Sequence, residues 1–273
     1  MMATTDEATT RTTLPRRRWP TPRMLALVGV VVAIHVVAMR QTDFSLGALA
    51  QGWSGMADFV AEAIPPDLSW RGVLLRSIKA AAVTLHIGLL GTTLSVPFAL
   101  ALAALAARST TSGLLAYQTA RSLLSFLRSV PDVVFALVFV TAVGLGPFAG
   151  VLALVFHNTG VMGKLWAEAM EEADPGPREA LRVHGATRAQ VVSHAVVPTV
   201  LPQLIGLLLY RFDVNVRSSL VLGLVGAGGI GFLINQSIKL FRFDEMFTHI
   251  LVVLVLVIAV DQLSGYIRRR IGS

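Results

Sequence analysis

Residues 174–198 read DPGPREALRVHGATRAQVVSHAVVP, a polar and charged stretch that separates two long apolar runs. Asp174 can cap a helix that begins at Pro175, where the missing backbone N–H group costs nothing. Gly185 can end this helix, because the residue just past a helix end often needs a positive φ angle. The first half of the stretch therefore predicts a short helix followed by a sharp turn.

The second half of the stretch predicts another short helix. Thr187 can cap it, because Gln190 follows three positions later, at the spacing of a capping box. We expect this helix to run to Val197 and to end where Pro198 begins the next apolar run. Two short helices held at an angle would form a rigid lever on the water side of a membrane protein, which suggests docking to a soluble partner. A helix–turn–helix connector with no partner is the alternative.

The composition indicates an integral membrane protein. Of the 273 residues, 54% are hydrophobic and only 14% are charged, and the mean hydropathy of +0.69 is too high for a soluble domain. The absence of cysteine excludes disulfides, thiolate metal sites and cysteine nucleophiles. The net charge of +7 does not indicate a nucleic-acid partner, because the arginines flank apolar runs and the positive-inside rule explains most of them.

The N-terminal quarter of the chain is predicted to differ from the rest. Residues 1–23 are Thr-rich and basic, which is typical of a disordered cytoplasmic tail. Residues 24–79 are expected to hold a short first span, over 24–39, and an external segment that lies at the membrane interface. A signal peptide is the alternative for the apolar run, but no A-x-A-like cleavage site follows it.

The whole chain is predicted to be all-helical with about six crossings and both termini in the cytoplasm. Val133–Val143 is too short to span alone, so the third crossing must begin near Thr119, which places Arg128 inside the membrane or at its edge. The other crossings are expected at 24–39, 80–107, 148–169, 198–222 and 246–267.

The polar stretch resembles the EAA signature of the membrane subunits of ABC importers, with the glycine-to-proline spacing intact. Leu181, Ala195 and Val197 stand where that family usually has Ala, Ile and Leu. The resemblance implies a cytoplasmic coupling loop over 170–197 that fits a cleft on an ATPase subunit, anchored by Glu179 and bent at Gly185. The coupling residues that it implies are Glu179, Ala180, Leu181, Arg182, Gly185, Ala186 and Thr187.

Further segments resemble the phosphonate-type branch of these permeases, and the resemblance covers about residues 80–270. They are RSVPD at 128–132, AVGLGP at 142–147, VRSS at 216–219 and VLGLVGAGGIG at 221–231. The resemblance implies a type I importer permease of the bacterial inner membrane that carries phosphonates, phosphate or phosphite by alternating access. It also implies a second copy or a close paralogue, an external substrate-binding protein, and two ABC ATPase subunits that bind ATP and Mg, with no cofactor in this chain.

The glycine-rich segment 226–231, GAGGIG, fits the dinucleotide motif G-x-G-x-x-G. That motif needs a βαβ unit, which cannot stand in lipid between two membrane spans. We therefore expect Gly226, Gly228 and Gly229 to form irregular backbone that lines the translocation path, with close packing of small residues as the alternative.

Charged residues within the fifth crossing are the most informative ones. Asp213 and Arg217 are four positions apart and can pair on one helix face, whereas Arg211 points elsewhere. The arginines attract or gate an anionic substrate in one hypothesis, and the pair only fixes packing at a dimer interface in the other. Arg128 is a further candidate for the path, although it can also reach the membrane surface.

The chain is expected to be a transporter subunit and not an enzyme. GVMGK at 160–164 is too short for a phosphate-binding P-loop, and no catalytic triad or metal-ligand spacing is evident. Two other functions stay open: the same machine for a different solute such as methionine, and a membrane-bound nicotinamide-dependent enzyme that uses residues 226–231.

Overall fold

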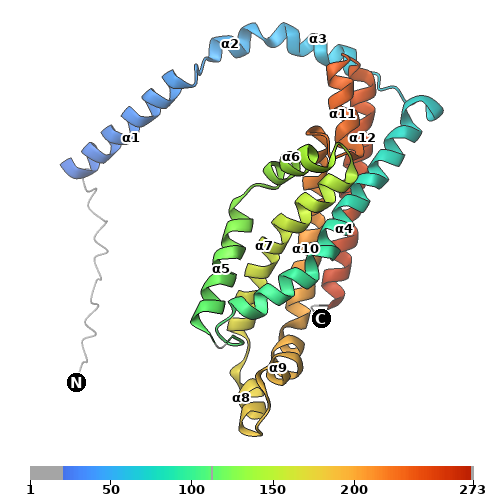
Figure 1. The fold of residues 1–273 in the computed structure, drawn as a ribbon. Coiled ribbons are helices and arrows are strands. Elements are labelled where there is room, and N and C mark those ends of the chain that lie inside the picture. The colour runs from blue at the N-terminus through green and yellow to red at the C-terminus, as the bar shows by residue number, and fades with distance from the viewer. Residues whose placement is uncertain (1–20, 112, 272–273) are drawn as a thin grey trace, which may run out of the picture. The chain divides into compact units, whose positions relative to one another are not determined.

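A computed structural model describes residues 21–111 and 113–271, and within these ranges every regular element is a helix. The elements of the first part of the chain are α1 (Pro22–Gln41), α2 (Leu46–Gln51), α3 (Trp53–Ala63), a π-helical turn (Trp70–Leu74), α4 (Leu75–Ala106) and α5 (Leu114–Ser129). Then follow α6 (Asp132–Val143), α7 (Pro147–Glu172), α8 (Pro175–Val183), α9 (Arg188–Val191), a second π-helical turn (Val192–Val196), α10 (Val197–Leu224), α11 (Gly229–Lys239) and α12 (Phe243–Ile271) (Figure 1).

The chain divides into two compact units, residues 1–57 and 58–273. Helix α1 of the first unit has 20 residues, a mean hydropathy of 2.0 and no buried residue. The helix extends beyond 24–39 by two residues at each end, Pro22, Arg23, Arg40 and Gln41, so the apolar run itself has the predicted bounds. That this run forms a short first span stays a prediction. Residues 1–20, which hold most of the predicted disordered tail, lie outside the described residues.

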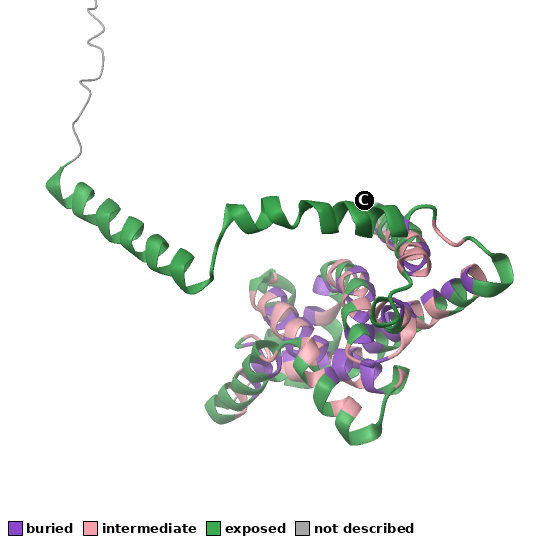
Figure 2. Ribbon diagram, turned by 90° about the horizontal axis from the view of Figure 1, so that it is seen from above, coloured by how far each residue is buried: buried purple, intermediate pink, exposed green. Residues whose placement is uncertain are grey.

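The second unit is a bundle of helices whose buried residues gather in its interior (Figure 2), and its most extensive helix pair is α4 with α7. Small residues bring these helices close together: a Cβ atom added to Gly91 on α4 would lie 2.5 Å from the Cβ atom of Leu154 on α7. Close approach of this kind is the usual way in which membrane helices gain packing contacts, since lipid gives them no hydrophobic driving force to associate.

The predicted third crossing is a broken helix and not a continuous one. Helices α5 and α6 meet at an angle of 86°, and only together do they meet the requirements for a span. The break lies at Val130, which is extended with φ −83° and ψ 120°, because the proline at 131 disfavours helical backbone in the residue before it. The described residues thus hold five helices long and apolar enough to cross a membrane, or six spans if the bent pair counts as one.

The expectation that the second short helix ends at Pro198 was also wrong. The path runs from α9 through the π-helical turn 192–196 into α10 with no intervening loop. Pro198 lies in the first turn of α10, and a local π-helical adjustment is one way in which a helix accommodates a proline without ending. The polar stretch is therefore rigidly connected to the fifth crossing.

Helix α11 was not predicted, because no helix was expected between the fifth and sixth crossings. It follows the glycine-rich turn and precedes α12, and it packs against α4, α10 and α12. At the opposite end of the second unit, α8 contacts the segment that joins α4 to α5, because Nη2 of Arg182 donates to the carbonyl of Ser109 at 3.4 Å (Figure 1).

Candidate functional site

Helix α8 begins and ends as its residues predicted. The Asp174 side chain accepts a hydrogen bond of 2.9 Å from the backbone N–H of Gly176 and caps the helix. At the other end, Gly185 has φ +78°, and its N–H donates to the carbonyl of Arg182 at 3.0 Å. The N–H of Ala186 donates to the carbonyl of Leu181 at 3.1 Å, which completes a Schellman motif.

The turn after α8 is fixed from its other side as well. The Thr187 N–H donates to Oε1 of Gln190 at 2.8 Å, and the Gln190 N–H donates back to the Thr187 hydroxyl, so the predicted capping box is confirmed. Leu181 and Ala186 pack against a buried cluster to which α4, α5, α7 and α10 contribute. Both caps and this apolar contact hold the hairpin in a defined geometry.

The outer face of the α8–α9 hairpin is exposed to solvent in the described structure. Glu179, Ala180, Arg182 and Thr187 are exposed, whereas Leu181 and Ala186 are half-buried. Val183 is 86% exposed and apolar, in the last turn of α8. A single exposed aliphatic side chain is common at protein surfaces and does not by itself mark a docking surface. Sequence reasoning did not single out Val183, because one apolar residue in an amphipathic helix reads as a core position.

A buried polar network crosses the middle of the second unit. Arg211 on α10 donates from Nε to Oδ1 of Asn158 on α7 at 2.9 Å, and from Nη2 to Oδ1 of Asn215 at 3.3 Å. The Asn215 amide donates to the Thr92 hydroxyl on α4 at 2.8 Å, and the Asn158 amide donates to the Ser95 hydroxyl at 2.7 Å. The network therefore joins α4, α7 and α10 through one cation.

Arg211 keeps its positive charge without a carboxylate partner. It is 9% exposed, and within residues 21–111 and 113–271 no acidic side chain forms an ion pair with it. Only two of the five N–H groups of its guanidinium are used in the hydrogen bonds to Asn158 and Asn215. A cation within a membrane span that only neutral amides hold is suited to attract an anion.

The predicted pair of Asp213 and Arg217 is confirmed. Nη2 of Arg217 contacts Oδ2 of Asp213, whose side chain is buried, whereas the Arg217 side chain is half exposed. The other carboxylate oxygen of Asp213 is buried and has no hydrogen-bond partner among the described residues. A buried acceptor left unsatisfied in this way costs free energy.

We predict that Arg217→Gln abolishes substrate uptake while the protein still assembles. Glutamine can keep a hydrogen bond to Asp213 but not the charge, so a role in packing alone would leave uptake nearly unchanged. Uptake by reconstituted vesicles and the yield of the assembled complex are the two measurements. Arg242→Gln, which removes an exposed charge paired with Glu245, is the matched control. Normal uptake by the Arg217→Gln variant would refute the gating hypothesis.

The glycine-rich turn is a packed junction in this structure. Gly228 and Gly229 have φ angles of +76° and +72°, and a Cβ atom on Gly228 would lie 2.9 Å from the ring of Pro147 at the start of α7. A Cβ atom on Gly229 would collide with the Thr84 hydroxyl on α4, which accepts the Ile230 N–H at 2.9 Å. The carbonyl of Gly226 accepts the Gly146 N–H at 3.0 Å. These contacts support the alternative of close packing, and the lining role of Gly226, Gly228 and Gly229 stays a prediction.

Arg128 lies apart from the other charged candidates. It is exposed in the last turn of α5, where a positive charge complements the helix dipole. The carbonyl of Val130, just beyond it, contacts Nδ1 of His157 at 3.0 Å. Arg211, Asp213 and Arg217 all lie on α10, where Arg211 joins the polar network and Asp213 pairs with Arg217. Arg128 lies on α5.

Other classes of site find no support in the described part of the chain. No group of three or more His, Asp or Glu residues there could hold a metal ion. No strand occurs in the described ranges, so residues 226–231 do not lie in a βαβ unit.

The chain matches a known family and known structures over most of its length. Residues 95–273 match the family described as "Binding-protein-dependent transport system inner membrane component". A phosphite transport system permease protein of Stutzerimonas stutzeri is 40% identical over 90% of this chain and 89% of its own. A phosphate-import permease of Mycolicibacterium smegmatis is 42% identical over 90% of this chain and 46% of its own.

Among solved structures, the chain is similar to one of the MetNI methionine ABC transporter in an inward-facing conformation. The TM-score is 0.59 and the identity 25%, over 73% of this chain and 96% of the solved one. This likeness confirms the all-helical fold of an importer permease, and the family consists of membrane permeases and not of nicotinamide-dependent enzymes. The chain therefore belongs to the family of inner membrane components of binding-protein-dependent ABC transport systems.

Proposed function

We propose that this chain is the permease subunit of an importer that carries phosphorus oxyanions, such as phosphite, phosphate or phosphonates, across the inner membrane. The observation that supports this most is the identity of about 40% with phosphite and phosphate permeases over 90% of the chain. The buried Arg211, which has no ion-pair partner in the described ranges, adds a physical reason, because a fixed positive charge within the bundle favours an anionic solute over a zwitterion such as methionine.

The orientation proposed here places the α8–α9 hairpin in the cytoplasm. The end of the second unit that carries it is rich in Arg and Lys, and positive residues flank spans mainly on the cytoplasmic side. They are Arg108, Arg121, Lys164, Arg178, Arg182, Arg188, Arg268, Arg269 and Arg270. With α1 and the bent pair each counted as a span, both termini then lie in the cytoplasm.

The mechanism proposed is alternating access driven by partner ATPases. Two copies of this chain, or this chain and a close paralogue, would form the pore, and an external binding protein would deliver the substrate. Each of two ATPase subunits would bind ATP and Mg and would receive Glu179, Val183 and the rest of the outer face of α8 in a cleft. Closure of the ATPases would then tilt α10 directly, because the hairpin continues into α10 with no intervening loop.

The test is reconstitution of the chain in vesicles with its ATPase and its binding protein. We expect ATP-dependent uptake of radioactive phosphate or phosphite, with competition by other phosphorus oxyanions and none by methionine. Vesicles reconstituted without the ATPase are the control. ATP-dependent uptake of methionine alone would refute the proposed substrate class, and failure of the chain to bind an ATPase would refute the importer itself.

A further inference from the structure

An open pocket of about 410 Å³ lies between α8 and the segment that joins α4 to α5. Its lining consists almost entirely of charged side chains: Arg108, Ser109, Glu171, Arg178 and Arg182. Three of these five residues are arginines, and the single acidic one comes from the end of α7. The balance of charge in the pocket therefore depends on what Glu171 is bonded to.

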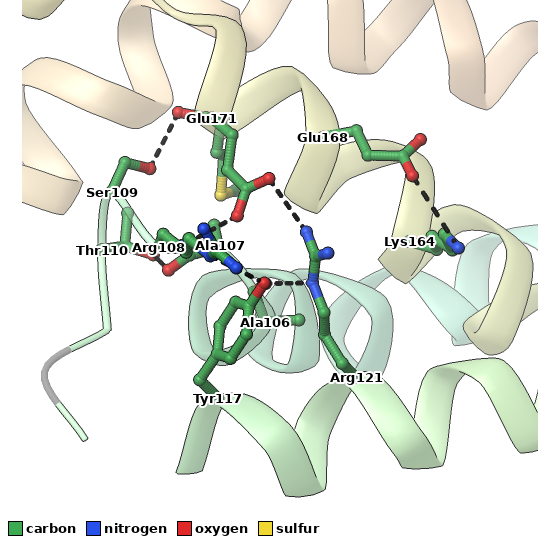
Figure 3. Close-up of polar contacts among 11 residues, drawn as sticks. Ala106, Ala107, Arg108, Ser109, Thr110, Tyr117, Arg121, Lys164, Glu168 and Glu171 are labelled. Atoms are coloured by element: carbon green, nitrogen blue, oxygen red, sulfur yellow. Dashed lines mark hydrogen bonds and ion pairs between the residues drawn. The ribbon is translucent and has the colours of Figure 1, made fainter. Parts of the chain in front are cut away.

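Both oxygens of Glu171 are already engaged, as Figure 3 shows. Oε1 accepts the backbone N–H of Arg108 at 2.8 Å, and Oε2 accepts Nη2 of Arg121 at 2.9 Å. The Arg121 guanidinium also lies over the Tyr117 ring at 4.9 Å and donates from Nε to the carbonyl of Ala106 at 3.1 Å. Glu171 is thus neutralised by Arg121, which does not line the pocket, and the pocket itself keeps an excess of positive charge.

Arg108 lines the pocket, and its guanidinium is held by Tyr117, over whose ring it lies at 5.3 Å. Its Nε donates to the Tyr117 hydroxyl at 3.1 Å, which raises the pKa of the guanidinium further above its usual value. Its backbone neighbour Ser109 donates to the carbonyl of Met170 at 2.9 Å (Figure 3). The wall of the pocket opposite α8 is therefore fixed in place before any ligand arrives.

The wall formed by α8 carries two arginines without acidic partners. Arg178 and Arg182 are four positions apart on one face, where like charges repel each other. Within the described ranges neither forms an ion pair, and the buried Nε of Arg178 has no hydrogen-bond partner. Nη2 of Arg182 reaches only the carbonyl of Ser109, at 3.4 Å. A bound anion would relieve the repulsion between the two guanidinium groups.

We propose that this pocket is a binding site for a small phosphate-class oxyanion, held by the guanidiniums of Arg108, Arg178 and Arg182. Planar guanidinium groups match the oxygens of such anions in pairs, and an oxyanion has enough acceptors to satisfy more than one arginine. The ligand is either a free oxyanion or the phosphate of an anionic lipid headgroup, which share this chemistry.

Occupation of the pocket would tie α8 to the segment before α5. Since the hairpin is the element that the ATPases are proposed to move, a bound oxyanion would restrain it and slow transport as product accumulates inside the cell. This consequence rests on the proposed function, whereas the binding site itself does not.

The experiment measures binding of inorganic phosphate to the full chain in lipid nanodiscs, by phosphorus NMR of the added phosphate. We expect saturable binding in discs of phosphatidylcholine, and a loss of affinity of about tenfold in Arg178→Gln, the size expected for one charge-assisted hydrogen bond. Arg188→Gln is the matched control, because it removes an equal charge from the same hairpin outside the pocket and should leave the affinity unchanged.

A second set of discs, which contain phosphatidylglycerol, distinguishes a free oxyanion from a lipid headgroup as the ligand, because phosphate binding is measured again in the presence of the anionic lipid. Phosphate binding that persists there assigns the site to free oxyanions, and phosphate binding that is competed away assigns it to a lipid headgroup. Equal affinity in the wild type and Arg178→Gln would overturn the proposal. So would a wild type that binds no phosphate in either set but loses its ATPase when Arg178 is replaced, because the pocket would then receive a protein carboxylate. None of these readouts depends on transport.

Discussion

Replacement of Gly185 by valine is expected to lower ATP-driven uptake by about tenfold. Gly185, which follows the end of α8, has a φ angle of +78°, which glycine adopts without steric strain. A β-branched side chain at this φ angle costs about 1–3 kcal/mol of strain. A cost of that size changes the population of the ordered hairpin about 5- to 30-fold or more. The Schellman motif would open, and Leu181 and Ala186 would lose the geometry that packs them on the core. Uptake and ATPase stimulation by the reconstituted complex are the measurements.

The matched control for this prediction is Gly265→Val on α12. A Cβ atom added at Gly265 meets nothing within 4 Å, and its backbone has no positive φ, so the same change in side chain should leave uptake almost intact. Glu179→Arg together with Gly185→Asp tests the same loop by charge, with co-purification of the ATPase as the readout. Full uptake by Gly185→Val would contradict a rigid lever, since the hairpin would then work without its turn.

The hairpin was predictable because its determinants are local. Asp174, Gly185, Thr187 and Gln190 each act within a few residues through a cap or a positive φ, and the structure confirms all of these roles. The bend at Val130 was missed although its cause, the next proline, is also local. The count of apolar residues needed for a span favoured one long crossing, and length alone cannot distinguish a straight helix from two that meet at an angle.

The polar network was out of reach of sequence reasoning for a different reason. Arg211 bonds to Asn158 across 53 positions of the chain, and Asn215 bonds to Thr92 across 123. No periodicity connects such residues, and a single Asn or Thr in an apolar run also fits an ordinary packed helix. The sequence did identify Arg211 as a costly charge within a span, which was the signal available, but its partners depend on how α4, α7 and α10 pack.

Removal of Asn158 from this network is expected to cost about 2 kcal/mol, because the Asn158→Leu variant leaves a buried cation short of an acceptor. The Arg211→Met variant removes the cation instead, and methionine fills the space with a flexible apolar chain. We expect the double variant to be more stable than Asn158→Leu alone, since a buried charge without its partner is worse than no charge. Thermal unfolding in detergent measures this difference.

Uptake separates the two roles that remain open for Arg211. If its charge attracts the oxyanion, both Arg211→Met and the stable double variant should lose uptake almost completely, although they fold. Arg211→Lys, which keeps a charge but cannot reach Asn158 and Asn215 with the same fork of donors, should retain a part of it. Stability that recovers in the double variant together with normal uptake would instead assign Arg211 to packing alone. Another positive charge would then have to attract the substrate. Arg217 on the same helix is the candidate, because its side chain is half exposed and lies beside the buried carboxylate of Asp213.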